Sequence, residues 1–237
     1  MILTKKDCIK WILLFLLSLS ATAVFFVGCA KSTAVNTQSR QTPTIIIDAG
    51  HGGEDGGAVA IDGTMEKTIN LSIAKQLRLL CQSAGMHTVM TRNQDVSIHD
   101  ENCSTIKARK TSDMNNRLKI FNADSNAIVV SIHQNKFEKE KYFGTQVFFS
   151  PNNPKSEFLA ENIRLSVTGM LQKNNTRENK KADKNIFLLY HCKQPSVLVE
   201  CGFLSNSEEL AKLKSDDYQK QMAFSIYCGI LAYITTV

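Results

Sequence analysis

From about residue 44 onward, short apolar runs alternate with longer segments in which apolar residues recur every three or four positions. The three isoleucines at positions 45–47 are typical of a strand that is buried on both faces. Five more strands are predicted over Thr88–Thr91, Ala127–His133, Thr145–Phe149, Ile186–Leu189 and Val197–Glu200. Helices are predicted over Lys67–Ala84, Asp113–Ala123, Lys155–Leu171 and from Asp216 toward the C-terminus. This alternation predicts an α/β domain whose parallel or mixed sheet is covered by helices on both faces.

Two polar stretches interrupt this pattern. Residues 92–117 show no clear hydrophobic period, and a loop of that length in a compact domain is usually functional or disordered. We therefore expect it to form part of a substrate groove. Residues 174–184 are also polar and charged, and they predict a second loop.

A membrane-directing segment precedes the domain. Three lysines occur within the first ten residues, and Trp11–Ala30 then carries no charge. Twenty helical residues are about 30 Å long, which matches the hydrocarbon thickness of a bilayer. The lysines favour the cytoplasmic side, so the domain is expected to face outward as part of the cell envelope. A cleaved secretory signal is one alternative, and lipidation of Cys29 within the lipobox-like sequence Phe26–Cys29 is another; all three export the domain.

The chain therefore divides into three parts: a membrane anchor or signal over residues 1–30, a linker over 31–43 and one globular domain over 44–237. The linker is rich in Ser, Thr, Asn and Gln, which is typical of a flexible segment. Five basic residues and one acidic residue give residues 1–40 a charge of +4, which leaves +2 of the total +6 for residues 41–237. A charge this small does not indicate nucleic-acid binding.

Seven cysteines are present, and five of them lie in the domain. Their spacing is irregular and contains no CxxC pair, so neither a disulfide framework nor a structural thiolate zinc site is indicated. We expect buried free thiols.

The candidate chemistry begins in the glycine-rich turn DAGHGGEDGG after the first strand, which presents Asp48 and His51. Glu66 precedes the first helix, His133 ends a strand, and Glu200 ends the apolar strand VLVE. Two imidazoles and one carboxylate suit a catalytic zinc ion, which takes three protein ligands and leaves one position for water. His51, Glu66 and His133 are therefore the predicted zinc ligands. Glu200 is the predicted general base, because strand packing would hold it rigidly near the metal.

Other interpretations of these residues are weaker. A glycine-rich turn can bind phosphate, but this one lacks the lysine of a P-loop and the GxGxxG order of a dinucleotide site. Glu200 could be a surface carboxylate at a strand end, although its neighbours are apolar. Cys201 would point to the opposite face of the strand, which disfavours it as a nucleophile. The remaining histidines, His87, His99 and His191, are interpreted as structural or exposed.

Several blocks, in order, resemble the zinc-dependent N-acetylmuramoyl-L-alanine amidases of bacterial cell walls: IIIDAGHGGEDGGAV, DGTMEKTINLSIAKQL, the TR pair at 91–92, NRLKIFNA, VVSIHQNKF and PSVLVECGFLSN. The resemblance implies a three-layer αβα sandwich around a mixed, mostly parallel sheet of about six strands. It implies hydrolysis of the amide between N-acetylmuramic acid and L-alanine in peptidoglycan. By motif, His51, Glu66 and His133 fall on the zinc ligands and Glu200 on the catalytic glutamate.

Within this family the chain is most similar to the amidase of endospore formers that acts on cortex peptidoglycan and prepares muramic δ-lactam. The shared features are the apolar N-terminal segment, the lack of wall-binding repeats and the polar stretch Asn102–Lys110. This likeness implies a site in the intermembrane space of the forespore. The segment Lys136–Pro195 is too short for the autoinhibitory helix of related families, so control by zinc loading or by an activating partner protein is expected.

Two other functions stay open at this stage. The domain could be another zinc peptidase, such as a carboxypeptidase that trims the stem peptide, or a wall-binding module without turnover. Asn135 and Arg92 are candidate contacts of the substrate groove.

Overall fold

The computed structural model describes residues 42–236. The predicted anchor or signal, Cys29 and nearly all of the predicted linker lie outside the described residues, so the division of the chain stays a prediction. Among the residues that are described, no helix is long and apolar enough to cross a membrane.

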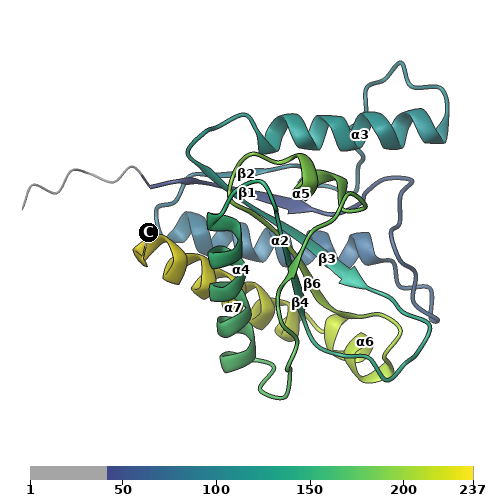
Figure 1. Ribbon diagram of the computed structural model, residues 1–237. Coiled ribbons are helices and arrows are strands. Elements are labelled where there is room, and N and C mark those ends of the chain that lie inside the picture. The colour runs from purple at the N-terminus through teal and green to yellow at the C-terminus, as the bar shows by residue number, and fades with distance from the viewer. Residues whose placement is uncertain (1–41, 237) are drawn as a thin grey trace, which may run out of the picture. The chain divides into compact units, whose positions relative to one another are not determined.

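One six-stranded sheet forms the centre of the domain, with strand order β2-β1-β3-β6-β4-β5 (Figure 1). The strands are β1 (Thr44–Ala49), β2 (Thr88–Met90), β3 (Ala127–Asn135), β4 (Gln146–Phe149), β5 (Lys180–Lys181) and β6 (Ser196–Phe203). All neighbouring pairs run parallel except β4 and β6, which are antiparallel. The predicted α/β class with a mixed, mostly parallel sheet of about six strands is therefore confirmed.

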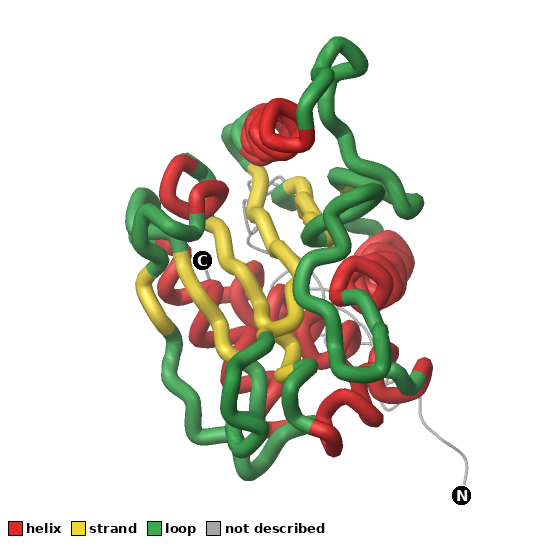
Figure 2. Tube along the Cα trace, turned by 90° about the vertical axis from the view of Figure 1, so that its right-hand side faces the viewer, coloured by secondary structure: helices red, strands yellow, loops and turns green. Residues whose placement is uncertain are grey.

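Helices cover both faces of this sheet (Figures 1 and 2). The helices are α2 (Glu66–Ser83), α3 (Ile106–Phe121), α4 (Lys155–Met170), α5 (Phe187–His191), α6 (Ser207–Leu213) and α7 (Asp216–Thr236). Helices α2, α4 and α7 bury their apolar residues in one core with Ile45 and Ile47, whereas α3 and α5 share a smaller core with Ile46. Successive β1 side chains thus enter opposite layers, which is why this strand is apolar throughout.

Two sequence-based predictions need correction here. Residues 186–189 do not form a strand, because the short helix α5 occupies 187–191 and packs Leu188 against the core under α3. An apolar run of four residues carries no period that separates a strand from a helical turn. Helix α3 begins at Ile106 rather than Asp113, and the Thr105 side chain caps it by accepting a hydrogen bond from Ala108 N.

The first part of α3, residues 106–112, was not predicted because its one buried residue is the polar Ser112. Ser112, Arg117 and Phe121 are its buried residues, so no apolar stripe marks the inner face. The expected loop over 92–117 is therefore limited to the part before α3. The second expected loop, 174–184, contains the two-residue strand β5, which pairs with the end of β4. Helix α6 was not predicted.

A buried carboxylate ties the sheet to α3. Asp48, at 0% exposure, accepts hydrogen bonds from Arg117 Nη1 at 2.6 Å, Ser131 Oγ at 2.6 Å and Thr91 Oγ1 at 2.7 Å. Burial alone would raise the pKa of Asp48, but the positive charge of Arg117, the nearby His133 and the two hydroxyl donors together hold this pKa below its usual range. The carboxylate is therefore ionised at neutral pH.

We predict that Asp48→Asn destabilises the protein by about 3–5 kcal/mol, because it leaves the buried Arg117 charge without this partner. Urea unfolding at pH 7 measures the change. Asp216→Asn is the matched control: its ion pair with Lys220 is exposed, so the change should stay within about 1 kcal/mol. Equal effects of the two substitutions would contradict the prediction.

The same carboxylate predicts that the free energy of unfolding falls at acid pH. Because the pKa of Asp48 is lower in the folded state than in the unfolded chain, its ionisation stabilises the fold above the unfolded value of about 3.9. That contribution is lost as the pH falls through the lower, folded pKa. The free energy of unfolding should therefore drop below about pH 4 more steeply in the wild type than in Asp48→Asn. Parallel pH profiles of the two proteins would argue against this origin.

Candidate metal centre

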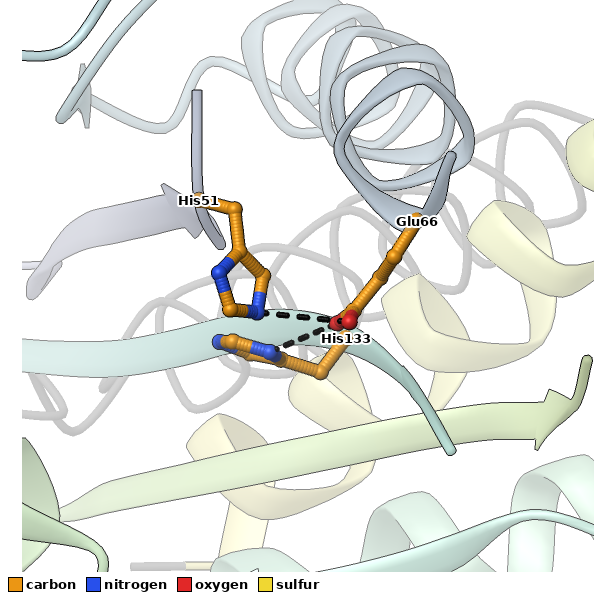
Figure 3. Close-up of side chains that lie close together, drawn as sticks. All are labelled: His51, Glu66 and His133. Carbon is orange, nitrogen blue, oxygen red and sulfur yellow. Dashed lines mark hydrogen bonds and ion pairs between the residues drawn. The ribbon is translucent and has the colours of Figure 1, made fainter. Parts of the chain in front are cut away.

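Three predicted ligands converge at the carboxyl edge of the sheet (Figure 3). His51 follows β1, Glu66 is the first residue of α2, and His133 lies near the end of β3. One donor atom from each residue lies within 4.8 Å of the other two. Parallel pairing of β1 with β3 brings the two histidines to the same edge, where their ring centroids are 5.0 Å apart.

Glu66 is the fixed centre of the cluster, with only 3% of its surface exposed. Its Oε1 lies 2.9 Å from His133 Nδ1 and its Oε2 lies 3.3 Å from His51 Nε2. Each oxygen also accepts a backbone hydrogen bond, Oε1 from Gln134 N at 3.0 Å and Oε2 from Ala58 N at 2.8 Å. These backbone donors set the rotation of the carboxylate independently of any ion.

Further hydrogen bonds orient the predicted ligands. Asp55 Oδ2 lies 3.0 Å from His51 Nδ1, which leaves Nε2 of that ring facing Glu66. Asn70, one helical turn after Glu66, donates from Nδ2 both to Glu66 Oε1 and to the Gly50 carbonyl, each at 3.2 Å. Such partners fix the tautomer and direction of metal-binding side chains. Asp55 and Asn70 were not predicted from the sequence, although each lies four residues after a predicted ligand.

Two glycines leave room for the ligands. A Cβ atom on Gly50 would lie 2.3 Å from Cε1 and Nε2 of His133. At Gly57, where φ is +69°, it would lie 2.5 Å from Glu66 Oε2 and 2.7 Å from His51 Cδ2. Glycine is therefore required at these two positions of the turn, because any side chain there would collide with the predicted ligands.

The charge balance of the cluster favours a cation. Burial alone would lower the pKa of His51, but the carboxylates of Asp55 and Glu66 outweigh it and raise this pKa to about 9. The pKa of Glu66 is held far below its usual range by the two histidines, against the effect of burial. A positive charge between these groups, whether a proton or a metal ion, is therefore stabilised.

The distances between the donor atoms also fit a metal ion. A tetrahedral ion with ligands about 2.1 Å away separates neighbouring donor atoms by about 3.4 Å. The two histidine nitrogens that face Glu66 lie 2.9 and 3.3 Å from its oxygens. Small outward shifts of the side chains would admit an ion.

Glu200 lies beside the cluster. It is the direct register partner of His133 on the neighbouring strand, so both side chains project from the same face of the sheet. Its Oε2 is buried and has no hydrogen-bond partner among the described residues. Burial raises the pKa of Glu200 to about 7, with Glu66 adding to the rise and the histidines opposing it. An unpartnered carboxylate with such a pKa is suited to proton transfer.

Arg92 and Asn135, the two predicted contacts of the substrate groove, lie in different surroundings. Arg92 is 3% exposed and donates to backbone carbonyls, so its prediction as a substrate contact is wrong. The TR motif signals a buried structural arginine rather than a surface group. Asn135 is half-buried at the end of β3, and its carbonyl accepts a hydrogen bond from Leu204 N. Its role in a groove stays a prediction.

Sequence comparison agrees with this arrangement. The profile of the N-acetylmuramoyl-L-alanine amidase family matches residues 45–232. The chain belongs to this amidase family. A germination-specific N-acetylmuramoyl-L-alanine amidase of Bacillus subtilis (strain 168) is 36% identical over 191 residues, which cover 81% of this chain and 79% of that protein.

Solved structures of amidases match as well. The CwlD amidase from Clostridioides difficile, in complex with the GerS lipoprotein, shares 40% identity with a TM-score of 0.79, over 83% of this chain and 100% of that one. An N-acetylmuramoyl-L-alanine amidase from Clostridium difficile 630 is 27% identical in sequence, with a TM-score of 0.70. The match covers 82% of this chain and 98% of that one. The predicted enzyme class is therefore confirmed.

We predict that Gly50→Ala weakens binding of a divalent metal to this amidase by at least about tenfold, because the new methyl group displaces His133. Gly50 lies outside the left-handed region, so alanine brings no backbone strain. Metal competition with a chromogenic chelator measures the affinity. Gly169→Ala is the control, since a Cβ there meets no atom within 4 Å. Unchanged affinity in Gly50→Ala would show that the ligands tolerate the displacement.

Proposed function

We propose that this amidase uses a zinc ion, held by His51, Glu66 and His133, to cleave the bond between N-acetylmuramic acid and L-alanine in peptidoglycan. The observation that carries the proposal is the convergence of three donor atoms within 4.8 Å beside the unpartnered carboxylate of Glu200. Two imidazoles and one carboxylate are a common ligand set of catalytic zinc. When bound, the ion polarises a carbonyl and lowers the pKa of coordinated water.

Glu200 is the proposed general base. Its raised pKa lets it accept a proton from the attacking water near neutral pH and then donate that proton to the departing nitrogen. The water oxygen bonds to the carbonyl carbon of the lactyl group, and the carbon–nitrogen bond breaks. The products are a lactyl carboxylate on the glycan and a free amino group on L-alanine.

The relatives and the predicted N-terminal segment support a biological setting for this activity. One relative is a germination-specific amidase, and a structural relative is the CwlD amidase. We infer that this chain acts outside the cytoplasmic membrane, on spore cortex peptidoglycan, in the formation of muramic δ-lactam. The N-terminal segment over residues 1–30 is the proposed means of export, as an anchor or as a signal.

A partner protein is part of the proposal. The CwlD amidase has been solved in complex with the GerS lipoprotein, so a relative at 40% identity binds another protein. We propose that the activity of this chain is controlled by its zinc loading or by an activating partner protein. Zinc titration of the purified protein tests the idea: full activity and tight zinc binding without any partner would remove the need for one.

Glu200→Gln should lower turnover of purified peptidoglycan by about 10²–10⁴-fold, because glutamine accepts no proton. Zinc affinity should change little, since Glu200 is not a proposed ligand. Mass spectrometry identifies the new ends: an amidase frees the amino group of L-alanine on an intact peptide, whereas a carboxypeptidase releases a C-terminal residue. Glu157→Gln, on the exposed face of α4, is the control and should retain activity. Full activity of Glu200→Gln would overturn the assignment of the base.

Removal of the metal should abolish activity reversibly. We expect a chelator to inactivate the protein and zinc to restore it, because the ion would leave a fourth coordination position for the attacking water and lower the pKa of that water. His133→Ala should stay inactive after zinc is added, whereas the exposed His191→Ala should recover like the wild type. Recovery of His133→Ala with wild-type zinc affinity would exclude His133 as a ligand.

A further inference from the structure

Two buried arginines lie against the turn that carries His51. Arg117 donates to the carbonyls of Ala49 and His51 at 2.9 and 2.7 Å. Arg92 donates to the carbonyls of Ala49 and Gly50 at 2.9 and 3.0 Å. Three successive carbonyl groups of the turn therefore point toward guanidinium groups.

The bonding of Arg92 is unusual for a buried arginine. Among the described residues, each of its hydrogen bonds goes to a backbone carbonyl, two in the turn and two more at Lys67 and Gln94. Buried charges are ordinarily paired with an opposite charge. Since this guanidinium bonds carbonyl oxygens instead, its position is explained by the backbone that it holds.

The turn needs such support. His51 is the one described non-glycine residue with positive φ, at +62°. This left-handed conformation is unfavourable for a non-glycine residue, and it persists when the surroundings determine it. A carbonyl bonded on either side of the His51 Cα fixes the two peptide planes that set φ and ψ. The imidazole then faces Glu66 without help from an ion.

We propose that Arg92 and Arg117 act as a carbonyl clamp, which we define as these two side chains, that positions His51 for metal binding. The inference rests on the proposed metal site. The clamp touches neither substrate nor metal; its effect passes through the backbone of residues 49–51.

Lysine cannot replace either member of the clamp. Arg117 divides its nitrogens among Asp113 through Nε, Asp48 and Ala49 through Nη1, and His51 through Nη2. A lysine ammonium keeps the charge that Asp48 requires but lacks the planar fork that reaches the His51 carbonyl at the same time. The charge and the geometry of the clamp can therefore be separated by experiment.

The test compares Arg92→Lys and Arg117→Lys with the wild type, using the full-length protein purified in detergent. Zinc affinity is measured by competition with a chromogenic chelator, and the melting temperature is measured with and without zinc. We expect each variant to bind zinc about 10 to 100-fold more weakly, as for disrupted partners of metal ligands. The rise in melting temperature on adding zinc should shrink accordingly.

Two control variants set the smallest and the largest expected loss of zinc affinity. Arg164→Lys makes the same exchange in an arginine of α4 that pairs with Glu161, and it should bind zinc like the wild type. His51→Ala removes the ligand itself and sets the largest loss that the clamp variants can show. Amide hydrogen exchange of residues 50–53 in the zinc-free protein should be faster in both clamp variants, which reports the loosened turn directly.

The outcomes separate the clamp from the metal assignment. Variants that melt earlier but bind zinc as tightly as the wild type would reduce the arginines to a structural role and overturn the proposal. If Arg117→Lys does not fold, Arg92→Lys decides, since none of its hydrogen bonds goes to a carboxylate. A wild-type protein without zinc affinity would overturn the metal site and the clamp together.

Discussion

The buried carboxylate of Glu66 is the group around which the functional edge of this fold is arranged. Its oxygens accept backbone hydrogen bonds from Ala58 and Gln134, and each faces one histidine. A charge with 3% exposure needs compensation, and two imidazoles supply it with a proton or a metal ion between them. The start of α2, the turn after β1 and the end of β3 are thereby brought to one point. The geometry of this edge is thus determined by electrostatics, whereas that of the core is determined by apolar packing.

Strand pairing and a buried ion pair hold the residues of this edge in place. The core strands pair in parallel, which places the residue after β1 and the end of β3 together and puts Glu200 beside His133. Asp48, one layer lower, joins β1 and β3 to α3 through Arg117. That arginine also holds the turn of His51. One buried ionic network thus serves both the stability of the sheet and the geometry of the site.

The sequence was sufficient to predict the elements that have a clear hydrophobic period and the site residues that lie in a motif. The sequence indicates the isoleucine strand, the amphipathic helices and the four candidate site residues His51, Glu66, His133 and Glu200. The strand predicted over residues 186–189, where α5 lies, was wrong because four apolar residues have no diagnostic period. The start of α3 was missed because its one buried residue before Asp113 is the polar Ser112. Polar groups that bond backbone leave little trace in hydrophobic periodicity, and the arginines were for this reason the least predictable part of the site.

The hydrogen bonds of Asn70 have a consequence for the mechanics of the domain. Its amide bridges Glu66 and the Gly50 carbonyl, so helix α2 and the turn of His51 move together. An ion held by the three proposed ligands would join segments as far as 82 residues apart in sequence, the separation of His51 and His133, as a covalent cross-link does. Unlike a disulfide, such an ion binds the assembled site and not the unfolded chain, so it would stabilise the folded edge by mass action. The metal would then be a structural staple of the sheet edge, and the metal-free protein would be the form most open to proteolysis.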